Sequence, residues 1–414
     1  MPKPALPQPF AEQHAGDPYP TYRALLEQGG MHRMTLRPGL EAWLVVDHGL
    51  VREALTHPAI SLESRHATPE VHEAIMAGYT EEKQSFFGRH LLAVDGADHT
   101  RMRRVMSRAL TARRFQAMTP EVESIAQTLL DDLPAPGHAD LTSALVVPFT
   151  IGVLARLMGV PDPGRMLLTD LANKVVQGQA EDDTGFGHVI AELTGYFSDL
   201  LDCPAEVPAE SLLAMLVEAR AAGTITAEET LSLVYQLFFA GHESSAYLMT
   251  NAIAVLLSRP GIAAELRSNP SLLDSAVEEL LRWEGSIKVG SWRFATEPLE
   301  LGGHRLQAGD PILVVLAAAN RDPEKFAAPD AFDIRRPSVP HVAFGHGPHH
   351  CLGAALGRLE ARTLLSALLT RFPDMTMAVP YEALHWRHNL IMRGPRHLPV
   401  TLGEDRHRGS SWPK

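Results

Sequence analysis

The chain has 414 residues, and 45% of them are hydrophobic, which is enough for a large buried core. A formal net charge of −12 argues against a general nucleic-acid binder, because neutralising phosphates requires a positive surface. Two cysteines in a chain of this length argue against a disulfide framework, and the N-terminus has no apolar run that could serve as a signal peptide or membrane anchor. We therefore expect a cytoplasmic, monomeric protein that binds neither nucleic acid nor membranes.

No internal repeat and no break in composition divides the chain. We expect one domain over residues 17–402, preceded by a proline-rich N-terminal extension at 1–16 and followed by a flexible tail at 403–414. Within the domain, residues 61–92 are rich in charged and small side chains, and we expect them to cover a binding site as a lid.

The first third of the chain carries local signals for short elements. Asp17-Pro18 is expected to begin a helix, and residues 43–46 are expected to form a strand. Thr119 followed by Pro120 has the residue types of an N-cap and a first helical position, so a helix is expected from there to residue 133.

A long helix is predicted in the second half of the chain. Thr226 and Glu229 have the spacing of a capping box, and an apolar helical pattern continues from them without interruption to residue 258. At about 1.5 Å per residue this helix would be roughly 50 Å long and would form the spine of the core. Within it, residues 240–245 (AGHESS) combine a glycine, an acid and two hydroxyls. These residue types are unfavourable in the interior of an apolar helix. Such a local conflict marks either a functional site or a helix bend with a solvated glutamate.

Strand signals are concentrated after residue 293, so the fold is predicted to be mainly α with small β-sheets. Gly302-Gly303 between two short alternating segments indicates a hairpin. Strands are expected at residues 299–301, 304–306, 311–316, 389–393 and 398–402.

Glu279 and Arg282 lie three residues apart on a predicted helix, so their side chains share one face. Pairs of this kind are common on protein surfaces, where they contribute less than about 1 kcal/mol. The pair therefore indicates a function only in combination with other motifs.

The segment FGHGPHHCLG at residues 344–353 places Cys351 after a glycine-rich loop and before an apolar helix predicted at 352–372. A thiolate there would be stabilised by the free N–H groups and the dipole of that helix, and such a sulfur is a suitable axial ligand of iron. Phe344 is placed to shield the sulfur from water. Two other interpretations stay open: a buried structural cysteine, or a zinc site shared with nearby histidines, which are His341, His346, His349 and His350.

The spacing Phe-x-x-Gly-x-x-x-Cys-x-Gly resembles the haem-binding loop of the cytochrome P-450 family, in the form typical of its soluble bacterial members. The resemblance extends over nearly the whole chain, from about residue 17 to residue 402. It implies a prism-shaped, mainly helical single domain with small β-sheets, in which haem b lies between the long helix and the helix after Cys351. Cys351 would be the iron ligand, and further haem contacts are implied for His99, Arg103, Arg293, Phe344, His349 and Gly353.

The segment at 240–244 resembles the family's oxygen-binding groove, Ala-Gly-x-(Asp/Glu)-Thr. The implied catalytic residues are Ala240, Gly241, Glu243 and Ser244. Gly241 would open the helix above the iron, Glu243 would relay protons, and the hydroxyl of Ser244 would support a water. Serine replaces the usual threonine here, which removes the β-branch that fixes the rotamer. Hydroxylation is therefore the first expectation, and oxidative coupling or another non-hydroxylating oxidation stays open.

The Glu279/Arg282 pair resembles the family's Glu-x-x-Arg motif, whose partner is a later arginine; Arg336 is the better match here and Arg335 the alternative. The implied role is structural, as a buried ion network that holds the cysteine loop. By motif position, the substrate is expected to contact Gln236, Phe239, Ile287, Val289, Ile391 and Met392.

The resemblance implies a monooxygenase that activates O2 and oxidises a small organic substrate. We expect that substrate to be an intermediate of specialised metabolism, carrier- or peptide-linked. Electrons would come from a ferredoxin with its reductase, which would dock on the cysteine face at Arg101, Arg104, Arg113 and Arg358. A non-catalytic haem-thiolate sensor is the remaining alternative.

Overall fold

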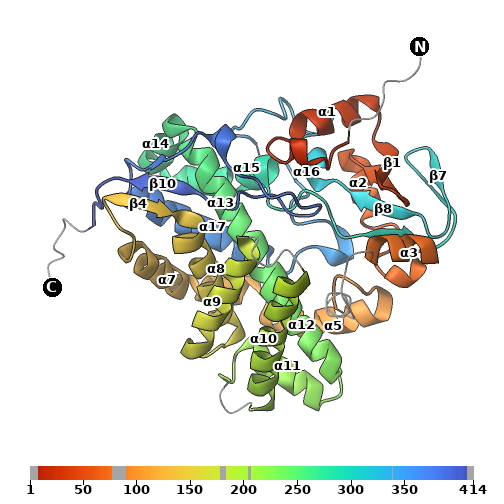
Figure 1. The fold of residues 1–414 in the computed structure, drawn as a ribbon, viewed down its shortest axis with the longest axis horizontal. Helices are drawn as coiled ribbons and strands as arrows, with labels where there is room; N and C mark the ends of the chain where they lie inside the picture. The colour runs from red at the N-terminus through yellow and green to blue at the C-terminus, as the bar shows by residue number, and fades with distance from the viewer. Residues whose placement is uncertain (1–7, 77–89, 178–182, 204–206, 338, 408–414) are drawn as a thin grey trace.

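The structure is a computed structural model that describes residues 8–76, 90–177, 183–203, 207–337 and 339–407. This part of the chain is mainly helical with three small sheets, as predicted, and it tapers towards α10 and α11 (Figure 1). The helices are α1 (Tyr19–Gln28), α2 (His48–Ala54), α3 (Pro69–Met76), α5 (Gly96–Ala109), α6 (Ala112–Ala117), α7 (Thr119–Asp131), α8 (Val147–Met158), α9 (Asp162–Val176), α10 (Asp183–Asp202), α11 (Leu212–Ala221), α12 (Ala227–Phe238), α13 (Ser244–Leu257), α14 (Pro260–Ser268), α15 (Leu273–Glu284), α16 (Leu316–Ala319) and α17 (Ala354–Arg371). The strands are β1 (Met31–Arg37), β2 (Leu40–Val45), β3 (Ile60–Ser61), β4 (Gly137–Asp140), β5 (Arg293–Ala295), β6 (Leu299–Leu301), β7 (His304–Leu306), β8 (Pro311–Val314), β9 (Thr376–Met377) and β10 (Pro399–Leu402).

The largest sheet joins the N-terminal strands to strands from the second half of the chain, in the order β1-β2-β8-β5-β3. Strand β2 pairs in parallel with β8, and the other neighbours are antiparallel. Val45 and Val314 pack into a cluster on one face of the sheet, whereas Leu44 and Leu313 pack into a different cluster. Because side chains alternate across a strand, this sheet is buried on both faces.

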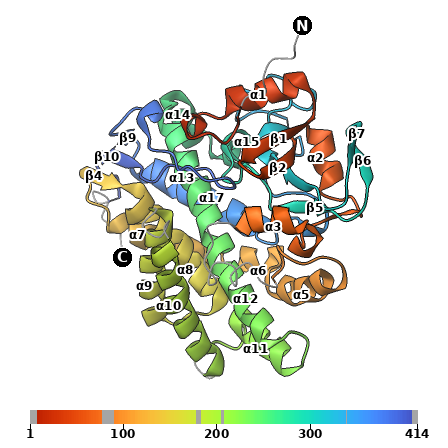
Figure 2. The same ribbon diagram turned by 45° about the vertical axis from the view of Figure 1, so that its right-hand side comes forward.

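Helix α13 runs through the middle of the molecule (Figure 2) and contacts α8, α14, α15 and α17. Every residue from 245 to 256 is buried. A helix with neighbours on all sides has no solvent face, which explains why this segment is apolar all round.

The long helix predicted at 226–258 has the expected start but is not a continuous α-helix. Thr226 and Glu229 form both bonds of the capping box. The turn Phe239–Glu243 is a π-helix, which separates α12 from α13. The prediction of an uninterrupted α-helix is therefore wrong at the segment whose composition conflicts with an apolar helix interior.

Two further helix predictions need small corrections. A helix follows Pro18 as expected, and it begins at Tyr19. The N-cap of α7 is Met118, so Thr119 already lies inside the helix and its side chain makes no capping bond. The turn before α7 is tight enough that Met118 itself has helical backbone angles, which moves the boundary by one residue.

Of the five strands expected after residue 293, four are present and one is not. Gly302 and Gly303 have φ values of 57° and 76° and join β6 to β7, as predicted for a two-residue hairpin. Strand β8 ends two residues earlier than expected, at Val314. Residues 389–393 form only an isolated bridge between Met392 and Ile287. The Asn389 side chain accepts hydrogen bonds from the backbone N–H groups of residues 391 and 392, and these bonds compete with a strand ladder.

Parts of the predicted terminal segments and lid lie outside the described residues, namely 1–7, 77–89 and 408–414. Within the described residues, no helix is both long and apolar enough to cross a membrane. Residues 8–16 are bound to the rest of the protein, since the carbonyls of Ala15 and Gly16 accept hydrogen bonds from Arg393.

Candidate active site

A glycine-rich loop presents Cys351 just before α17. Gly345 and Gly347 have φ values of 71° and 75°, in the left-handed region that favours glycine. A Cβ atom at Gly347 would lie 2.5 Å from Cγ2 of Thr56, so a larger residue would push the loop outwards. The backbone N–H of Cys351 donates to the carbonyl of Phe344 at 3.0 Å and closes the loop. These restraints fix the sulfur two residues before the N-cap of α17.

The thiol of Cys351 is accessible, yet protein atoms surround it closely. Burial raises its pKa above the ordinary value and outweighs the opposing effects of the Gly353 N–H and of the charges on Arg103 and Arg358. The helix N-terminus therefore does not ionise this thiol by itself, contrary to the expectation from sequence. A metal cation bound at the sulfur would supply the missing stabilisation of the thiolate.

The histidines near Cys351 do not form a zinc site with it. Three of them bind different neighbours, in the pairs His341–Glu278 (3.2 Å), His346–Arg52 (3.4 Å) and His349–Asp95 (2.7 Å). Across the residues that the structure describes, no group of three or more His, Cys, Asp or Glu side chains could hold a metal ion. The zinc interpretation therefore lacks a ligand set.

Basic side chains from three separate segments gather where haem contacts were expected: His99 and Arg103 on α5, Arg293 on β5, and His349 in the cysteine loop. The ring centroids of His99 and His349 are 4.0 Å apart. Nε2 of His99 and Nδ1 of His349 are buried and have no hydrogen-bond partner among the described residues. Burial, with the charges of His349 and Arg103, lowers the pKa of His99 to about 4. Such orphaned buried atoms call for a bound group that can hydrogen-bond to them.

Arg293 is a buried cation that forms no ion pair within the described part of the chain. Only 5% of its surface is exposed, and Nη1 reaches the carbonyl of Ser291 at a long 3.4 Å. Burial lowers the pKa of its guanidinium to about 10, against the opposing charge of Asp95. A buried charge is costly unless it is paired, so this site fits a ligand that carries carboxylates.

The predicted oxygen-binding groove coincides with the π-helical turn Phe239–Glu243. Gly241 faces α8, where a Cβ atom would lie 3.2 Å from Cδ1 of Leu154. Ala240 is exposed, although Phe238 and Phe239 before it are buried and α13 after it is almost wholly buried. The Ser244 hydroxyl donates to the Ala240 carbonyl at 2.7 Å, a bond that Ser commonly makes where a helix bends. One side of the π turn is therefore open to a small molecule.

Glu243, the acid predicted for this groove, forms an ion pair with an arginine from the C-terminal part of the chain. Glu243 is buried, and its Oε1 accepts from Nη1 of Arg387 at 2.6 Å. Burial raises the pKa of Glu243, while the charge and hydrogen bond of Arg387 oppose that rise. Glu243 and Ser244 are neighbours in the chain, but their side chains bind different partners. Glu243 binds Arg387, whereas Ser244 binds the Ala240 carbonyl. Arg387 was not recognised from sequence, because it is 144 residues away and belongs to no motif.

Glu360 is a second residue that the sequence analysis missed. It is buried in α17, burial raises its pKa to about 8, and Ser245 makes an opposing hydrogen bond. Its Oε2 has no partner among the described residues. A signal was present, because Glu360 lies four residues from both Leu356 and Leu364 on the apolar face of the helix.

The structure brings Glu279, Arg282 and Arg336 into one buried ion network. Arg282 donates to both oxygens of Glu279 at 2.7 Å, and Nε of Arg336 donates to the same oxygens at 3.1 Å. The remaining N–H groups of both arginines donate to backbone carbonyls. Arg335, the alternative partner, instead pairs with Glu265 at the surface.

This network is tied to the cysteine loop through Asn320. Arg282 donates to the Asn320 carbonyl at 2.9 Å, and the Asn320 side chain accepts from the Val342 N–H at 2.8 Å. The Val342 carbonyl in turn accepts from Gly345 in the loop at 2.9 Å. This series of hydrogen bonds therefore connects the buried ion network to the loop that presents Cys351.

The residues predicted to contact substrate have different surroundings. The Gln236 side chain accepts from the Leu91 N–H at 3.1 Å, which ties the end of the predicted lid to α12. Phe239 is buried and packs against Phe186 of α10, with ring centroids 5.7 Å apart. Gln236 lies near the end of α12, and Phe239 is the first residue of the π turn.

Four more predicted substrate residues come from two paired segments. Ile287 and Met392 form a backbone bridge, and the Ile391 carbonyl accepts from the Lys288 N–H at 2.9 Å. Val289 is fully buried with Leu44 in the cluster on one face of the large sheet. Val289 is therefore packed in the core, and its contact with substrate stays a prediction.

Comparisons with known proteins agree with this site. The family model described as Cytochrome P-450 matches residues 203–378. Cytochrome P-450 monooxygenase PikC of Streptomyces venezuelae is 39% identical over 404 residues, which cover 97% of this chain and 94% of that protein. The chain belongs to the cytochrome P-450 family.

Other relatives support the same assignment. The 6-deoxyerythronolide B hydroxylase of Saccharopolyspora erythraea is 32% identical over 93% of this chain and 96% of that protein. The structure of the tirandamycin C-bound P-450 monooxygenase TamI matches with a TM-score of 0.87 and 35% identity, over 95% of this chain and 99% of that one. As a cytochrome P-450, this protein is a haem-thiolate monooxygenase that uses a haem iron cofactor, O2, an organic substrate and redox partners.

The residues of this cytochrome P-450 fit such a cofactor. Cys351 offers an accessible sulfur, and haem carboxylates would provide partners for Nε2 of His99, Nδ1 of His349 and the Arg293 guanidinium, which have none among the described residues that could neutralise or hydrogen-bond them fully. Phe344 packs beside the loop, with the Arg358 guanidinium 4.6 Å from its ring centroid.

The arginines expected to meet a redox partner fall into two groups. Arg101 pairs with Glu229 at 2.7 Å, and Arg358 pairs with Glu278. These two charges are already neutralised inside the protein. Arg104 and Arg113 are exposed and form no ion pair within the described residues.

Proposed function

We propose that this cytochrome P-450 binds haem b and inserts one oxygen atom into an apolar intermediate of specialised metabolism. The observation that carries the proposal is an accessible cysteine sulfur beside Arg293, a buried cation with no ion pair among the described residues, and beside buried ring nitrogens of His99 and His349 that have no hydrogen-bond partner there. The two free thiols among the described residues support a reducing, cytoplasmic location, and we propose a monomer with one domain over residues 17–402, between the predicted terminal segments.

In this proposal each residue has a defined task. Cys351 is the thiolate ligand, and His99, Arg103, Arg293 and His349 bind the two haem carboxylates. Haem iron with a thiolate ligand supplies the chemistry of oxygen activation. The chain's own groups orient the substrate, exclude water and hold protons at Ser244 and Glu243 for delivery to the reacting oxygen.

The relatives do not agree on one substrate. Their names describe a 6-deoxyerythronolide B hydroxylase, a vitamin D(3) 25-hydroxylase and a nocardicin C N-oxygenase, so the substrate of this chain is proposed from its own residues. For this chain we propose hydroxylation of a substrate that meets Gln236, Phe239, Ile287, Ile391 and Met392. A coupling reaction is the second candidate, because Ser244 replaces threonine and a structural neighbour, 31% identical, is described as an enzyme for C–S bond formation.

The spectrum of the purified protein tests the haem assignment. After reduction and addition of carbon monoxide, the protein should show the red-shifted Soret band of a thiolate ligand, and extraction should release haem b. A screen for compounds that displace water from the iron should then identify substrate classes. Protein that binds iron but consumes no reductant with any ligand from the screen would indicate a sensor.

Replacing Ser244 with alanine should divert reducing equivalents to peroxide without changing the reduced carbon monoxide spectrum. The variant loses the hydroxyl that donates to Ala240 and that we propose supports a water. Product formed per reductant consumed should fall by about tenfold or more, because a positioned proton donor contributes 10²–10⁴-fold. Ser258→Ala, at the C-terminal end of α13, is the matched control. Unchanged coupling in Ser244→Ala would remove this role.

We propose that a ferredoxin docks beside the cysteine loop through Arg104 and Arg113. Reversing both charges to glutamate should raise the KM for reduced ferredoxin several-fold at low salt, and the difference should shrink as salt is added. Arg335→Glu, away from the loop and paired with Glu265, serves as the control. Equal KM values for both variants would place the docking surface elsewhere.

A further inference from the structure

The loop at residues 389–392 contains Ile391 and Met392, which we propose contact the substrate. The Asn389 side chain folds this loop, since its Oδ1 accepts from the N–H groups of residues 391 and 392 at 2.8 and 3.0 Å. The Ile391 carbonyl accepts from the Lys288 N–H at 2.9 Å, and the loop forms an isolated bridge in place of a strand. A loop without a strand ladder opens easily unless other groups hold its two ends.

Both ends of this loop are bound to the N-terminal part of the chain. We call residues 8–16 the N-terminal strap. His388, directly before the loop, donates through Nε2 to the Phe10 carbonyl at 2.8 Å. Arg393, directly after the loop, donates to the carbonyls of residues 15 and 16 at 2.6 and 2.9 Å. One segment of the chain therefore holds the loop at its start and at its end.

Arg393 connects the strap to the helices around the site. The residue is only 3% exposed, and its side chain forms an ion pair with Glu284 of α15. Its guanidinium lies 3.8 Å from the ring centroid of Trp386. The Arg393 backbone binds other neighbours, because its N–H donates to the Ser286 carbonyl at 2.8 Å and its carbonyl accepts from Asn251 of α13 at 3.0 Å. The strap is therefore linked to α13 and α15 through this one arginine.

Phe10 gives the strap a second contact, near the segment that pairs with the loop. Phe10 and Leu390 both pack against the cluster that contains Val289. The Lys288 ammonium lies 6.0 Å from the Phe10 ring centroid, within the range of a cation–π interaction. Lys288 is 5% exposed and forms no ion pair within the described part of the chain, and burial with the charge of Arg393 lowers its pKa to about 8. The Phe10 ring therefore stabilises a buried charge that has no acidic partner there.

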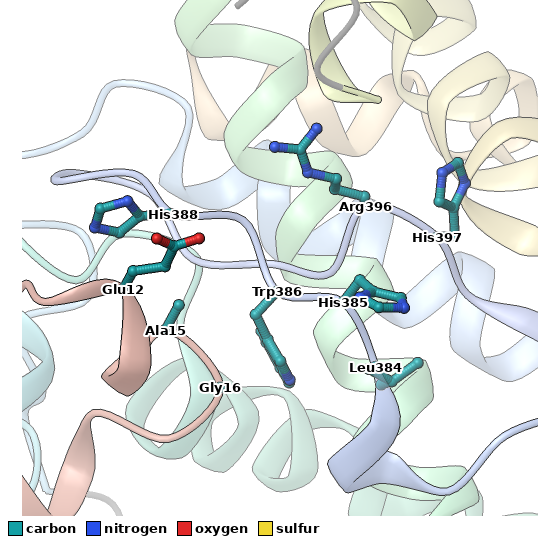
Figure 3. A pocket seen from close by; sticks show the side chains of 9 residues that line it. All are labelled: Glu12, Ala15, Gly16, Leu384, His385, Trp386, His388, Arg396 and His397. Carbon is teal, nitrogen blue, oxygen red and sulfur yellow. The ribbon is translucent and has the colours of Figure 1, made fainter.

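A surface pocket of about 470 Å³ lies between the strap and residues 384–397 (Figure 3). Its lining residues are Glu12, Ala15, Gly16, Leu384, His385, Trp386, His388, Arg396 and His397. The two segments do not pack against each other across this pocket. The strap is held by the hydrogen bonds at residues 388 and 393 and by the Phe10 contact, so substitutions at these points should loosen it.

We propose that the N-terminal strap is part of the substrate-binding unit, because it fixes the 389–392 loop through His388 and Arg393. This role rests on the proposed contact of Ile391 and Met392 with the substrate, and it adds the segment that sets their position. A loop that is already ordered loses less conformational freedom when a ligand binds. The strap therefore increases the affinity for ligands large enough to reach the loop, with His388 and Arg393 as positioning residues.

The test compares the binding of two imidazoles to the haem-loaded full chain. Imidazole binds iron through a ring nitrogen, and 4-phenylimidazole does the same but adds a ring that extends towards the pocket walls. In Phe10→Ala/His388→Ala, the Kd of 4-phenylimidazole should rise by about tenfold, whereas the Kd of imidazole should change by less than about twofold. His388→Gln keeps a side-chain N–H donor, so its Kd values should stay close to those of the wild type.

His397→Ala is the matched control. His397 is also an exposed histidine that lines the pocket, but it pairs with Asp140 of β4 and makes no hydrogen bond to the described part of the strap. Its removal should leave both Kd values unchanged. Arg393 is kept in all variants, since its loss would also leave Glu284 buried without a counter-charge and would destabilise the fold.

Amide hydrogen exchange gives a readout that is independent of ligand binding and turnover. The N–H groups of Ile391, Met392 and Arg393 are all hydrogen-bonded within the protein. In Phe10→Ala/His388→Ala these three amides should exchange about tenfold faster, because the loop opens more often when the strap is loosened. Their exchange in His397→Ala should match that of the wild type.

Two results would overturn the proposal. Unchanged exchange of these amides in Phe10→Ala/His388→Ala would mean that the strap does not hold the loop. Faster exchange with an unchanged ratio of the two Kd values would mean that the loop does not shape the ligand site. Absence of a haem spectrum that responds to either imidazole in the wild type would instead contradict the proposed function, and the exchange comparison would still decide whether the strap fixes the loop.

Discussion

Replacing Cys351 with alanine should abolish the red-shifted Soret band of the reduced, carbon monoxide-bound protein and all product formation. The sulfur is the ligand that the loop from residue 344 to 353 positions, with the Cys351 N–H bonded to the Phe344 carbonyl. Without it the basic cluster can still attract haem carboxylates, but the iron has no thiolate ligand. We expect residual haem binding with a spectrum typical of a nitrogen or water ligand.

Cys203→Ala is the matched control for this experiment, because Cys203 is the other free thiol in the described residues and lies at the end of α10. It should retain the band and the activity in full. A thiolate-type band that survives in Cys351→Ala would mean that another residue ligates the iron, and the site would need to be reassigned.

Replacing Glu279 with glutamine should destabilise the protein by about 3–5 kcal/mol, because it leaves Arg282 and Arg336 buried without their shared counter-charge. The amide has nearly the same shape as the carboxylate, so the loss reports charge rather than volume. Chemical denaturation with haem absorbance as a second signal should show unfolding and haem release at lower denaturant concentration. The link through Asn320 to Val342 predicts that haem release begins first.

The neighbouring Arg335 provides a matched control for the Glu279 prediction. It pairs with Glu265 at the surface, where the side chains are 59% and 37% exposed. Glu265→Gln likewise removes a carboxylate that pairs with an arginine. It should lower the free energy of unfolding by less than about 1 kcal/mol, because exposed ion pairs contribute little. Similar losses for Glu265→Gln and Glu279→Gln would contradict the structural role of the buried network.

Features that depend on neighbouring residues were predictable from the sequence. The capping box at Thr226 and the hairpin at Gly302-Gly303 form as expected, because the atoms that make them are only a few residues apart. At the π turn, the sequence showed residue types that do not suit an apolar helix, but it did not show that the backbone would form a π-helix. The strand expected at 389–393 failed because Asn389 binds its own backbone, a competition that an apolar pattern does not reveal.

Features that depend on long-range packing were less predictable. The sequence identified Glu243 but not Arg387, since their meeting requires the segment around Arg387 to fold onto the helix that contains Glu243. It counted Arg101 and Arg358 as free surface charges, whereas each has an acidic partner from another helix. In each case the sequence shows which charged residue is present, but the residue that it pairs with is determined by the tertiary fold.

The π turn also has a consequence for helical phase. Each residue of an α-helix advances by about 100° around the axis, and the wider π turn delays the helix after it by roughly one position. Deleting one residue from Phe239–Glu243 would therefore remove the extra residue and leave α13 in nearly its present phase relative to α12. Asn251 would still face the carbonyls of Glu284 and Arg393, to which it donates. The extra residue thus serves the open turn at Ala240 and not the packing of α13, so its removal should close that turn while the fold persists.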